Sequence, residues 1–265
     1  MKRSYSGKVI LITGGGSGLG QALCWQFAKL QAKVAFSDIN DRGLRETAEV
    51  LKQAGATFLP FRGDVSQLED CQRFAATVLQ EFGQIDILVN NAGITHIKPF
   101  LPGDEEAVRR LMNINFMGSV YMWSVCDSAI RRQKGQLIVI SSVAGFAPLY
   151  GRTAYAASKH ALHGFFETLR TELFDDHVHV LMVCPSFIAT GIRKNAFDGA
   201  GAKGKGTTGQ IATPEQIAQK IIDAAASEQR LLITGKTGIL SYWVKKLAPR
   251  YYEKQMLKAM RKNGM

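Results

Sequence analysis

A tyrosine, a lysine and a serine between positions 142 and 159 could together perform acid–base chemistry on a bound substrate. Tyr155 and Lys159 stand four residues apart in TAYAASKHAL, a segment of helical character, so both side chains lie on one face. A free tyrosine has a pKa of about 10, and a neighbouring ammonium favours its phenolate form. We therefore expect Lys159 to lower the pKa of Tyr155 into a range useful for proton transfer. Ser142, at the end of the apolar segment 136–141, could donate a hydrogen bond to a substrate oxygen.

The segment LITGGGSGLG at 11–20 places five glycines close behind an apolar run. Glycine is costly in regular structure, so such a cluster marks positive φ angles or close approach of the backbone to a ligand. Where a strand of a parallel sheet leads into a helix, the free N–H groups of that helix attract phosphate. The spacing GxxxGxG therefore favours a turn that holds the pyrophosphate of a dinucleotide, with contacts from Gly14, Ser17, Gly18, Leu19 and Gly20.

An acidic residue stands where the adenosine ribose of such a dinucleotide is expected. Asp38 follows the second apolar segment, where its carboxylate would accept hydrogen bonds from the ribose hydroxyls and repel a 2′-phosphate. This position predicts NAD as the cofactor and NADP as the less favoured alternative. Arg42, four residues further on, is the feature that argues for NADP.

Two further turns follow apolar segments. In GDV at 63–65, Asp64 could accept from the adenine amino group and Val65 could pack on the ring, or Asp64 could simply cap a helix. In NNAG at 90–93, Asn91, Ala92 and Gly93 fit a tight turn along which the cofactor could lie. Alternatively, these residues form a turn that has no part in binding.

Regular alternation of apolar segments and helical segments organises the chain. This order predicts an α/β fold, a single-domain Rossmann-type doubly wound parallel sheet of about seven strands with helices on both faces. No change in composition marks a second domain, so residues 1–265 are expected to form one dinucleotide-binding catalytic domain. A segment rich in Gly, Lys and Thr at 191–214 is expected to be a mobile substrate loop. The expected strands are 8–13, 33–37, 57–61, 86–90, 136–141, 179–184 and 230–234.

The chain carries 33 Lys and Arg against 22 Asp and Glu, and the excess is concentrated in the tail at 239–265. Two interpretations of this basic helical tail remain open. It could be a solvated helix, or a membrane-surface helix whose apolar side consists of Trp243, Tyr251, Tyr252, Met256 and Leu257. Nucleic-acid binding is not expected, because no recognised motif accompanies the charge.

The four cysteines are widely spaced and fall in segments expected to be regular structure, which indicates reduced core residues. No metal-ligating cluster, signal peptide or membrane-spanning stretch is recognised. We therefore expect a cytoplasmic protein, with membrane association only through the tail.

Taken together, the motifs resemble the short-chain dehydrogenase/reductase family. The resemblance covers about residues 8–234 and is carried by Thr13, Gly14, Gly18, Gly20, Asn90 to Gly93, Asn115, Ser142, Tyr155 and Lys159. It implies that Tyr155 is the general acid/base, that Ser142 orients the carbonyl and that Lys159 also binds the nicotinamide ribose. It implies further that Asn115 anchors a water that relays protons between Lys159 and solvent.

The same resemblance implies contacts after the sixth expected strand. Pro185, Ile188 and Thr190 would bind the nicotinamide end of the cofactor, and Ser186 stands where the family usually has Gly. Members of the family usually form homodimers or homotetramers through the two long helices that carry the Asn and the Tyr.

The residues near Tyr155 suggest the substrate class. Besides Ser142 and Tyr155, apolar Phe146, Leu149 and Phe187 are expected to contact substrate, which favours a lipophilic alcohol or ketone similar to a steroid, a retinoid or another lipid. The function predicted is NAD-dependent hydride transfer between nicotinamide and such a substrate. The alternatives are an NADPH-dependent 3-oxoacyl thioester reductase and a non-catalytic dinucleotide-binding protein.

Overall fold

A parallel sheet forms the centre of the molecule. The computed structural model describes residues 3–186 and 212–262, and within them seven strands pair in the order β3-β2-β1-β4-β5-β6-β7. Each of the seven expected segments forms a strand, so the predicted sheet is confirmed. The strands are β1 Val9–Thr13, β2 Lys33–Asp38, β3 Phe58–Arg62, β4 Ile87–Asn90, β5 Gln136–Ile140, β6 His179–Cys184 and β7 Leu231–Ile233.

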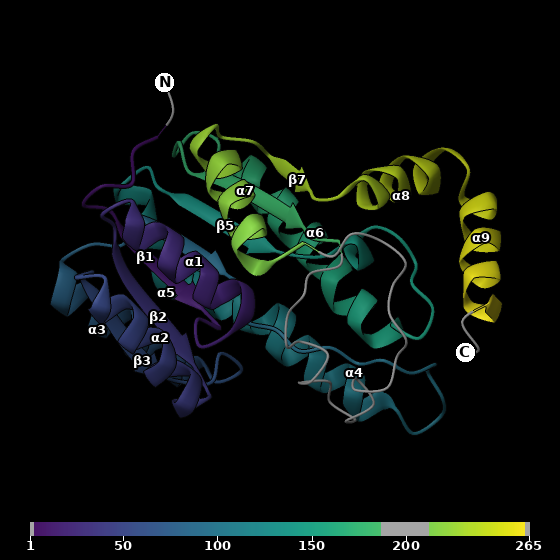
Figure 1. The fold of residues 1–265 in the computed structure, drawn as a ribbon, viewed down its shortest axis with the longest axis horizontal. Coiled ribbons are helices and arrows are strands. Elements are labelled where there is room, and N and C mark those ends of the chain that lie inside the picture. The colour runs from purple at the N-terminus through teal and green to yellow at the C-terminus, as the bar shows by residue number, and fades with distance from the viewer. Residues whose placement is uncertain (1–2, 187–211, 263–265) are drawn as a thin grey trace.

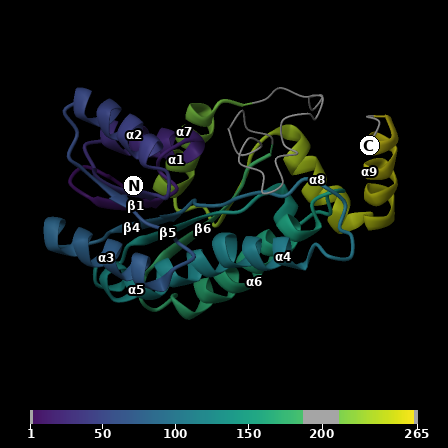
Figure 2. The ribbon, with the colours of Figure 1, turned by 90° about the horizontal axis from the view of Figure 1, so that it is seen from below.

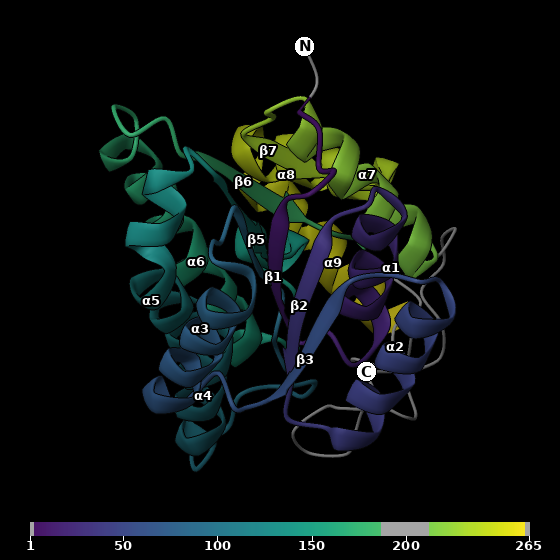
Figure 3. The ribbon, with the colours of Figure 1, turned by 90° about the vertical axis from the view of Figure 1, so that its left-hand side faces the viewer.

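Helices cover both faces of this sheet. Figures 2 and 3 show α1, α2 and α7 on one face and α3, α5 and α6 on the other. Short helical segments η1 and η2 join these elements near the carboxyl ends of the strands. The bounds are α1 Gly18–Lys29, α2 Asp41–Gln53, α3 Leu68–Phe82, α4 Glu105–Leu111, η1 Met112–Met117, α5 Gly118–Arg132, η2 Val143–Gly145, α6 Thr153–Glu172 and α7 Pro214–Ala226.

Strand residues alternate between two hydrophobic cores. Ile10 and Ile12 of β1 belong to the core that contains α1 and α7, whereas Val9 and Leu11 belong to the core that contains α3, α5 and α6. All four side chains are buried. Because both faces of the strand are covered, every position favours an apolar residue, which explains the continuous apolar run in the sequence.

The direction of winding reverses at β1. Strands β2 and β3 lie on one side of β1, and β4 to β7 lie on the other. The connections that follow β1 and β4 therefore lead to opposite faces of the sheet, which leaves a crevice beyond their carboxyl ends. Thr13 ends β1 and Asn90 ends β4, so the glycine-rich turn and the NNAG turn meet at this crevice.

The C-terminal tail forms two helices instead of one. Helix α8 covers Lys236–Leu247 and α9 covers Pro249–Lys262, and Figure 1 shows the pair extending beyond one end of the sheet. The break falls at Ala248 because a proline disfavours helical conformation in the residue before it. Among the described helices, none combines the length and the apolar character needed to cross a membrane.

Two other expectations concern the cysteines and the loop. Cys24, Cys71, Cys126 and Cys184 are buried and unpaired, as expected of core residues. The segment expected to be a mobile loop lies outside the described residues except for its last three positions, where Thr213 forms a capping box at the start of α7.

Candidate active site

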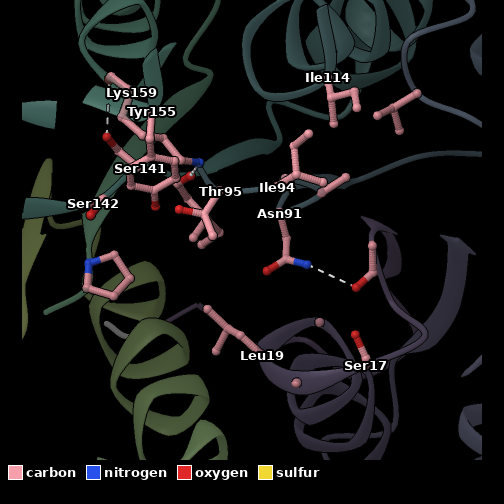
Figure 4. A pocket seen from close by; sticks show the side chains of 18 of the residues that line it. Ser17, Leu19, Asn91, Ile94, Thr95, Ile114, Ser141, Ser142, Tyr155 and Lys159 are labelled. Carbon is pink, nitrogen blue, oxygen red and sulfur yellow. Dashed lines mark hydrogen bonds between the residues drawn. The ribbon is translucent and has the colours of Figure 1, made fainter. Parts of the chain in front are cut away.

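A cavity of about 900 Å³ opens at the carboxyl ends of the strands, and it extends from the glycine-rich turn to α8 and α9. Figure 4 shows Ser142, Tyr155 and Lys159 on one side of this cavity and Ser17 and Leu19 on the other. Most residues that the sequence predicts for cofactor or substrate contact line it. They are Gly14, Ser17, Gly18, Leu19, Gly20, Asp38, Asp64, Val65, Asn91, Ala92, Gly93, Ser142, Leu149, Tyr155, Lys159 and Pro185.

The glycine-rich turn is shaped for close backbone packing. Gly14 has a φ of +67°, and a Cβ placed on Gly20 would lie 2.0 Å from the carbonyl oxygen of Gly14. Ser17 stands at the N-cap of α1, yet its side chain makes no capping hydrogen bond, and the first turn of the helix contains no acidic residue. No side chain in the described part of the chain therefore caps these N–H groups, and the turn fits a pyrophosphate.

Helix α2 supports this turn from behind, a contribution that the sequence analysis missed. The buried hydroxyl of Thr47 donates to the carbonyl of Gly15 at 3.0 Å and accepts from the Gln21 amide at 3.0 Å. A Cβ on Gly43 would lie 2.5 Å from the carbonyl oxygen of Gly16. A threonine on the apolar face of an amphipathic segment is the signal that could have revealed this contact.

Asp38 ends β2 directly beside the same turn. One carboxylate oxygen accepts from the backbone N–H of Gly16 and the other from that of Asn40, both at 3.0 Å. Each oxygen keeps a further lone pair for another donor. Arg42 points elsewhere, because its exposed guanidinium pairs with Glu46 at 2.7 Å.

Asp64 and Val65 line the cavity next to Asp38. The Asp64 carboxylate accepts from both the backbone N–H and the hydroxyl of Ser66, at 2.9 and 2.8 Å. The N-cap of α3 is Gln67, so the alternative in which Asp64 caps that helix is wrong. Asp64 instead closes a local turn.

The NNAG turn is tied to the end of β1. The Thr13 hydroxyl oxygen accepts from the backbone N–H groups of Asn91 and Ala92, both at 3.0 Å. The Asn91 amide in turn donates to the carbonyls of Thr13 and Gly14, at 2.8 and 3.1 Å. The Asn91 side-chain amide is therefore already engaged in hydrogen bonds within the protein. Together these bonds hold the glycine-rich turn and the NNAG turn side by side at the cavity.

Helix α6 presents Tyr155 and Lys159 to the cavity, as their spacing predicts. The Lys159 Nζ lies 5.8 Å from the centre of the Tyr155 ring and donates to the carbonyl of Ile140 at 2.8 Å. Ser142 follows β5, and its hydroxyl oxygen accepts from the N–H of Ala144 at 3.1 Å. The three side chains therefore converge, with a hydroxyl, a phenol and an ammonium facing one space.

Burial governs the protonation of this group. It raises the pKa of Tyr155, a shift that the Ser142 hydroxyl and the charge of Arg152 partly oppose. Burial also lowers the pKa of Lys159 to about 8. Arg152, whose guanidinium lies 5.8 Å from the ring centre, is a second cation beside this phenol, and the expected effect of Lys159 on the pKa of Tyr155 stays a prediction.

Asn115 lies behind the cavity wall in the π-helical segment η1, a feature common at functional sites. Its carboxamide oxygen accepts from the N–H of Ile94 at 2.8 Å, and its nitrogen donates to Ile94 and to the Ser158 hydroxyl. A Cβ on Gly93 would lie 3.1 Å from that oxygen and 3.7 Å from Lys159 Nζ. Asn115 is thus close to Lys159, but both donors of its side chain are already used.

Two expectations about the cavity lining need correction. Phe146 is not among the lining residues, because its ring packs edge-on against His163 and Tyr242. Tyr252 and Met256, expected on the apolar side of a surface helix, instead line the cavity. The sequence does not reveal this, because the contact depends on how the break at Ala248 folds α9 back. Phe187, Ile188 and Thr190 lie outside the described residues.

Comparison with known proteins adds independent information. The family model for short chain dehydrogenases matches residues 8–201. Human epidermal retinol dehydrogenase 2 is 34% identical over 258 residues, covering 94% of this chain and 80% of that protein. An 11-beta-hydroxysteroid dehydrogenase A from Sesamum indicum is 32% identical over 258 residues, covering 94% and 74%.

A solved structure is similar across nearly the whole fold. It is a short chain dehydrogenase/reductase from Burkholderia phymatum, determined in complex with NAD. The identity is 25%, the TM-score is 0.84, and the match covers 92% of this chain and 94% of that one.

Proposed function

The chain belongs to the short-chain dehydrogenase family and is an oxidoreductase with a nicotinamide dinucleotide cofactor; from that premise we propose that it uses NAD to oxidise a lipophilic secondary alcohol or reduce the matching ketone. The observation that carries the proposal is one cavity with Asp38 beside the glycine-rich turn and Ser142, Tyr155 and Lys159 at the far side. Hydride transfer requires the nicotinamide to lie beside the reacting carbon, and a cavity that runs from Asp38 to the catalytic side chains would let an extended dinucleotide reach them.

Asp38 supports NAD over NADP. Its carboxylate is held on both oxygens by backbone N–H groups, so it has little freedom to turn away from a ligand at the glycine-rich turn. A 2′-phosphate placed there would face this negative charge, whereas ribose hydroxyls would donate to it. Arg42, the residue that could have neutralised such a phosphate, is engaged with Glu46.

The chain's own residues divide the chemistry as follows. NAD, when bound, supplies the hydride acceptor of the oxidation. The Ser142 hydroxyl donates to the substrate oxygen and fixes its position, and Tyr155 takes the hydroxyl proton as the carbon–hydrogen bond breaks. Lys159 donates one hydrogen bond to the carbonyl of Ile140, which orients the ammonium. Its two remaining N–H groups could donate to the cofactor ribose.

The lining of the cavity supports a lipophilic substrate. Ile94, Val143, Leu149 and Met256 contribute apolar surface near the catalytic side chains. Transfer of an apolar substrate from water onto this surface is favourable by about 25 cal/mol per Å². The names of the similar proteins, a retinol dehydrogenase and a hydroxysteroid dehydrogenase, point to the same class of substrate.

The test is turnover measured by nicotinamide absorbance over steroid, retinoid, aliphatic and acyl-thioester substrates, with NAD and NADP compared. We expect turnover of a lipophilic alcohol with NAD, and a loss of about 10²- to 10⁴-fold in Tyr155→Phe with NADH binding unchanged. Tyr150→Phe, at an exposed residue outside the cavity lining, is the matched control. Equal turnover in Tyr155→Phe would refute the catalytic role, and preference for NADPH with acyl thioesters would favour the reductase alternative.

We propose further that α8 and α9 contact an anionic membrane surface. Leu240, Trp243, Leu247 and Tyr251 are more than half exposed, at 53–76%. Basic residues lie on the same two helices, which matches the charge of anionic lipid. They are Lys245, Lys246, Arg250, Lys254 and Lys258.

Vesicle binding tests this contact. Truncation of the tail would also remove Tyr252 and Met256 from the cavity, so surface substitutions are the cleaner variants. Trp243→Ser with Leu247→Ser should weaken binding to phosphatidylserine vesicles, and Leu101→Ser, at an exposed site elsewhere, should not. Unchanged binding in the double variant would refute the contact.

The predicted cytoplasmic location stays a prediction.

A homodimer or homotetramer through α5 and α6 completes the proposal. Tyr121, Val125 and Phe165 of these helices are only partly buried within one chain, which supports a further partner on this face. Light scattering tests it, and a monomeric mass would contradict it.

A further inference from the structure

The tail contributes a buried phenol to the cavity that no step of the proposed reaction uses. Tyr252 of α9 is 7% exposed, and it belongs to a small apolar cluster with Val143 and Ala147. Val143 directly follows Ser142 and also lines the cavity. The Tyr252 side chain therefore lies next to the part of the cavity where Ser142 would hold the reacting oxygen.

The hydroxyl of this tyrosine has no hydrogen-bond partner among the described residues. Ser241 of α8 lines the same cavity, and its hydroxyl is near enough to oppose the burial that raises the pKa of Tyr252. The two hydroxyls nevertheless do not reach hydrogen-bond geometry with each other. Most buried polar atoms in folded proteins are paired, so an unpaired hydroxyl in a cavity wall suggests a missing ligand.

We propose that Tyr252 and Ser241 form a polar subsite that hydrogen-bonds a second oxygen of the substrate, a hydroxyl or an oxo group distinct from the one that reacts. This inference rests on the proposed function and narrows its substrate class to lipophilic alcohols or ketones with two oxygen groups. Val143 packs with Tyr252 and directly follows Ser142 in the cavity lining, so apolar surface is present near both polar groups, which suits a hydrocarbon body between the two oxygens.

The chemistry of the subsite favours a neutral group. Both members are uncharged hydroxyls that donate one hydrogen bond and accept others. Burial keeps Tyr252 protonated at neutral pH, so it is available as a donor to an oxo or hydroxyl oxygen. A carboxylate or an ammonium would lose its hydration there and gain no counter-ion from these two side chains.

Matched steroid probes test the subsite. One is an androstane with a single hydroxyl, and the other is the androstane diol with a hydroxyl at each end of the ring system. Affinity of each for the enzyme–NADH complex is measured by fluorescence in wild type, Tyr252→Phe, Ser241→Ala and the control Tyr251→Phe, whose side chain is exposed. Thermal unfolding of each ligand-free variant is recorded in parallel.

We expect tighter binding of the diol in wild type, and a loss of about tenfold in Tyr252→Phe for the diol only. The single-hydroxyl probe and NADH should bind all four proteins equally, and the Tm of Tyr252→Phe should not fall. A lowered Tm with unchanged diol preference would mean that the hydroxyl serves an internal contact, which overturns the subsite. A loss shared by NADH would assign Tyr252 to the cofactor and also overturn it.

Failure of the subsite and of the proposed function remain separable. If neither probe binds while acyl thioesters turn over with NADPH, the lipophilic class is wrong and the subsite falls with it. If the single-hydroxyl probe turns over with NAD and Tyr155→Phe abolishes that turnover, the proposed function stands whatever Tyr252→Phe does.

Discussion

Replacing Asp38 by asparagine changes one charge at the point where NAD and NADP differ. In the wild type the carboxylate accepts one backbone N–H on each oxygen, from Gly16 and from Asn40. The carboxamide of the Asp38→Asn variant has a single oxygen and can accept only one of the two. The substitution therefore forfeits about 1 kcal/mol of local hydrogen bonding in addition to the charge. Loss of a charged acceptor for the ribose hydroxyls should weaken NADH binding by about tenfold.

The opposite effect is expected for NADPH. A phosphate with nearly two negative charges about 5 Å from the carboxylate is repelled by roughly 2 kcal/mol at a water-like dielectric and by roughly 6 kcal/mol at an effective dielectric of about 20. Asp38 is only partly buried, so the lower figure applies. Removing the charge should therefore lower the ratio of the NADPH and NADH dissociation constants by at least about 30-fold.

Fluorescence titration of NADH and NADPH gives both constants directly. Asp41→Asn is the matched control, because Asp41 is an acidic neighbour outside the cavity lining that pairs with Arg62 at 3.4 Å. A ratio in Asp38→Asn that stays within about threefold of wild type would refute the reasoning, since the charge would then contribute almost nothing to cofactor choice. Equal affinity of the wild type for both cofactors would refute the NAD assignment itself.

Three further predictions concern the supports of the site. Thr13→Val should lower the free energy of unfolding, measured by urea titration, by about 3 kcal/mol, because the N–H groups of Asn91 and Ala92 lose their acceptor. The control Thr57→Val, at an exposed position, should leave the free energy of unfolding unchanged. Thr47→Val should weaken NADH binding severalfold, because the glycine-rich turn loses its hydrogen bond from α2, while the Kd of steroid probes for the enzyme–NADH complex should not change. An unaltered Kd for NADH would show that α2 does not support the cofactor site. Because burial lowers the pKa of Lys159 to about 8 from its usual 10.5, the unfolded chain binds more protons between these values and stability should rise with pH there, by about 2 kcal/mol from pH 8 to pH 10. The same titration on Lys159→Met should lack this rise, and an equal rise in both proteins would mean that Lys159 is not its source.

The sheet and most of the cavity lining could be predicted because the information is local. Val9 to Ile12 are all buried between two helical layers, so a continuous apolar run suffices to identify a parallel strand. The positions of Asp38 and Asn91 then follow, because the ends of parallel strands meet at one edge. The contribution of Tyr252 could not be predicted in this way, since a residue more than a hundred positions from Ser142 reaches the cavity only through the packing of α8 and α9.

The protonation of Tyr155 shows a second limit of spacing arguments. Tyr155 and Lys159 share one face of α6, as four-residue spacing requires, but the sign of a pKa shift depends on the balance between charge and desolvation. Both side chains are almost fully buried, so desolvation raises the pKa of the phenol and lowers that of the amine, and each change favours the neutral form. With a pKa of about 8, Lys159 still carries its charge in most molecules at pH 7, although burial makes that charge less favourable than in water. Arg152, placed at the N-cap of α6 by the turn that precedes the YxxxK motif, keeps a positive charge beside the ring. We therefore expect proton transfer to depend on Arg152, three positions before the tyrosine, as well as on the lysine four positions after it.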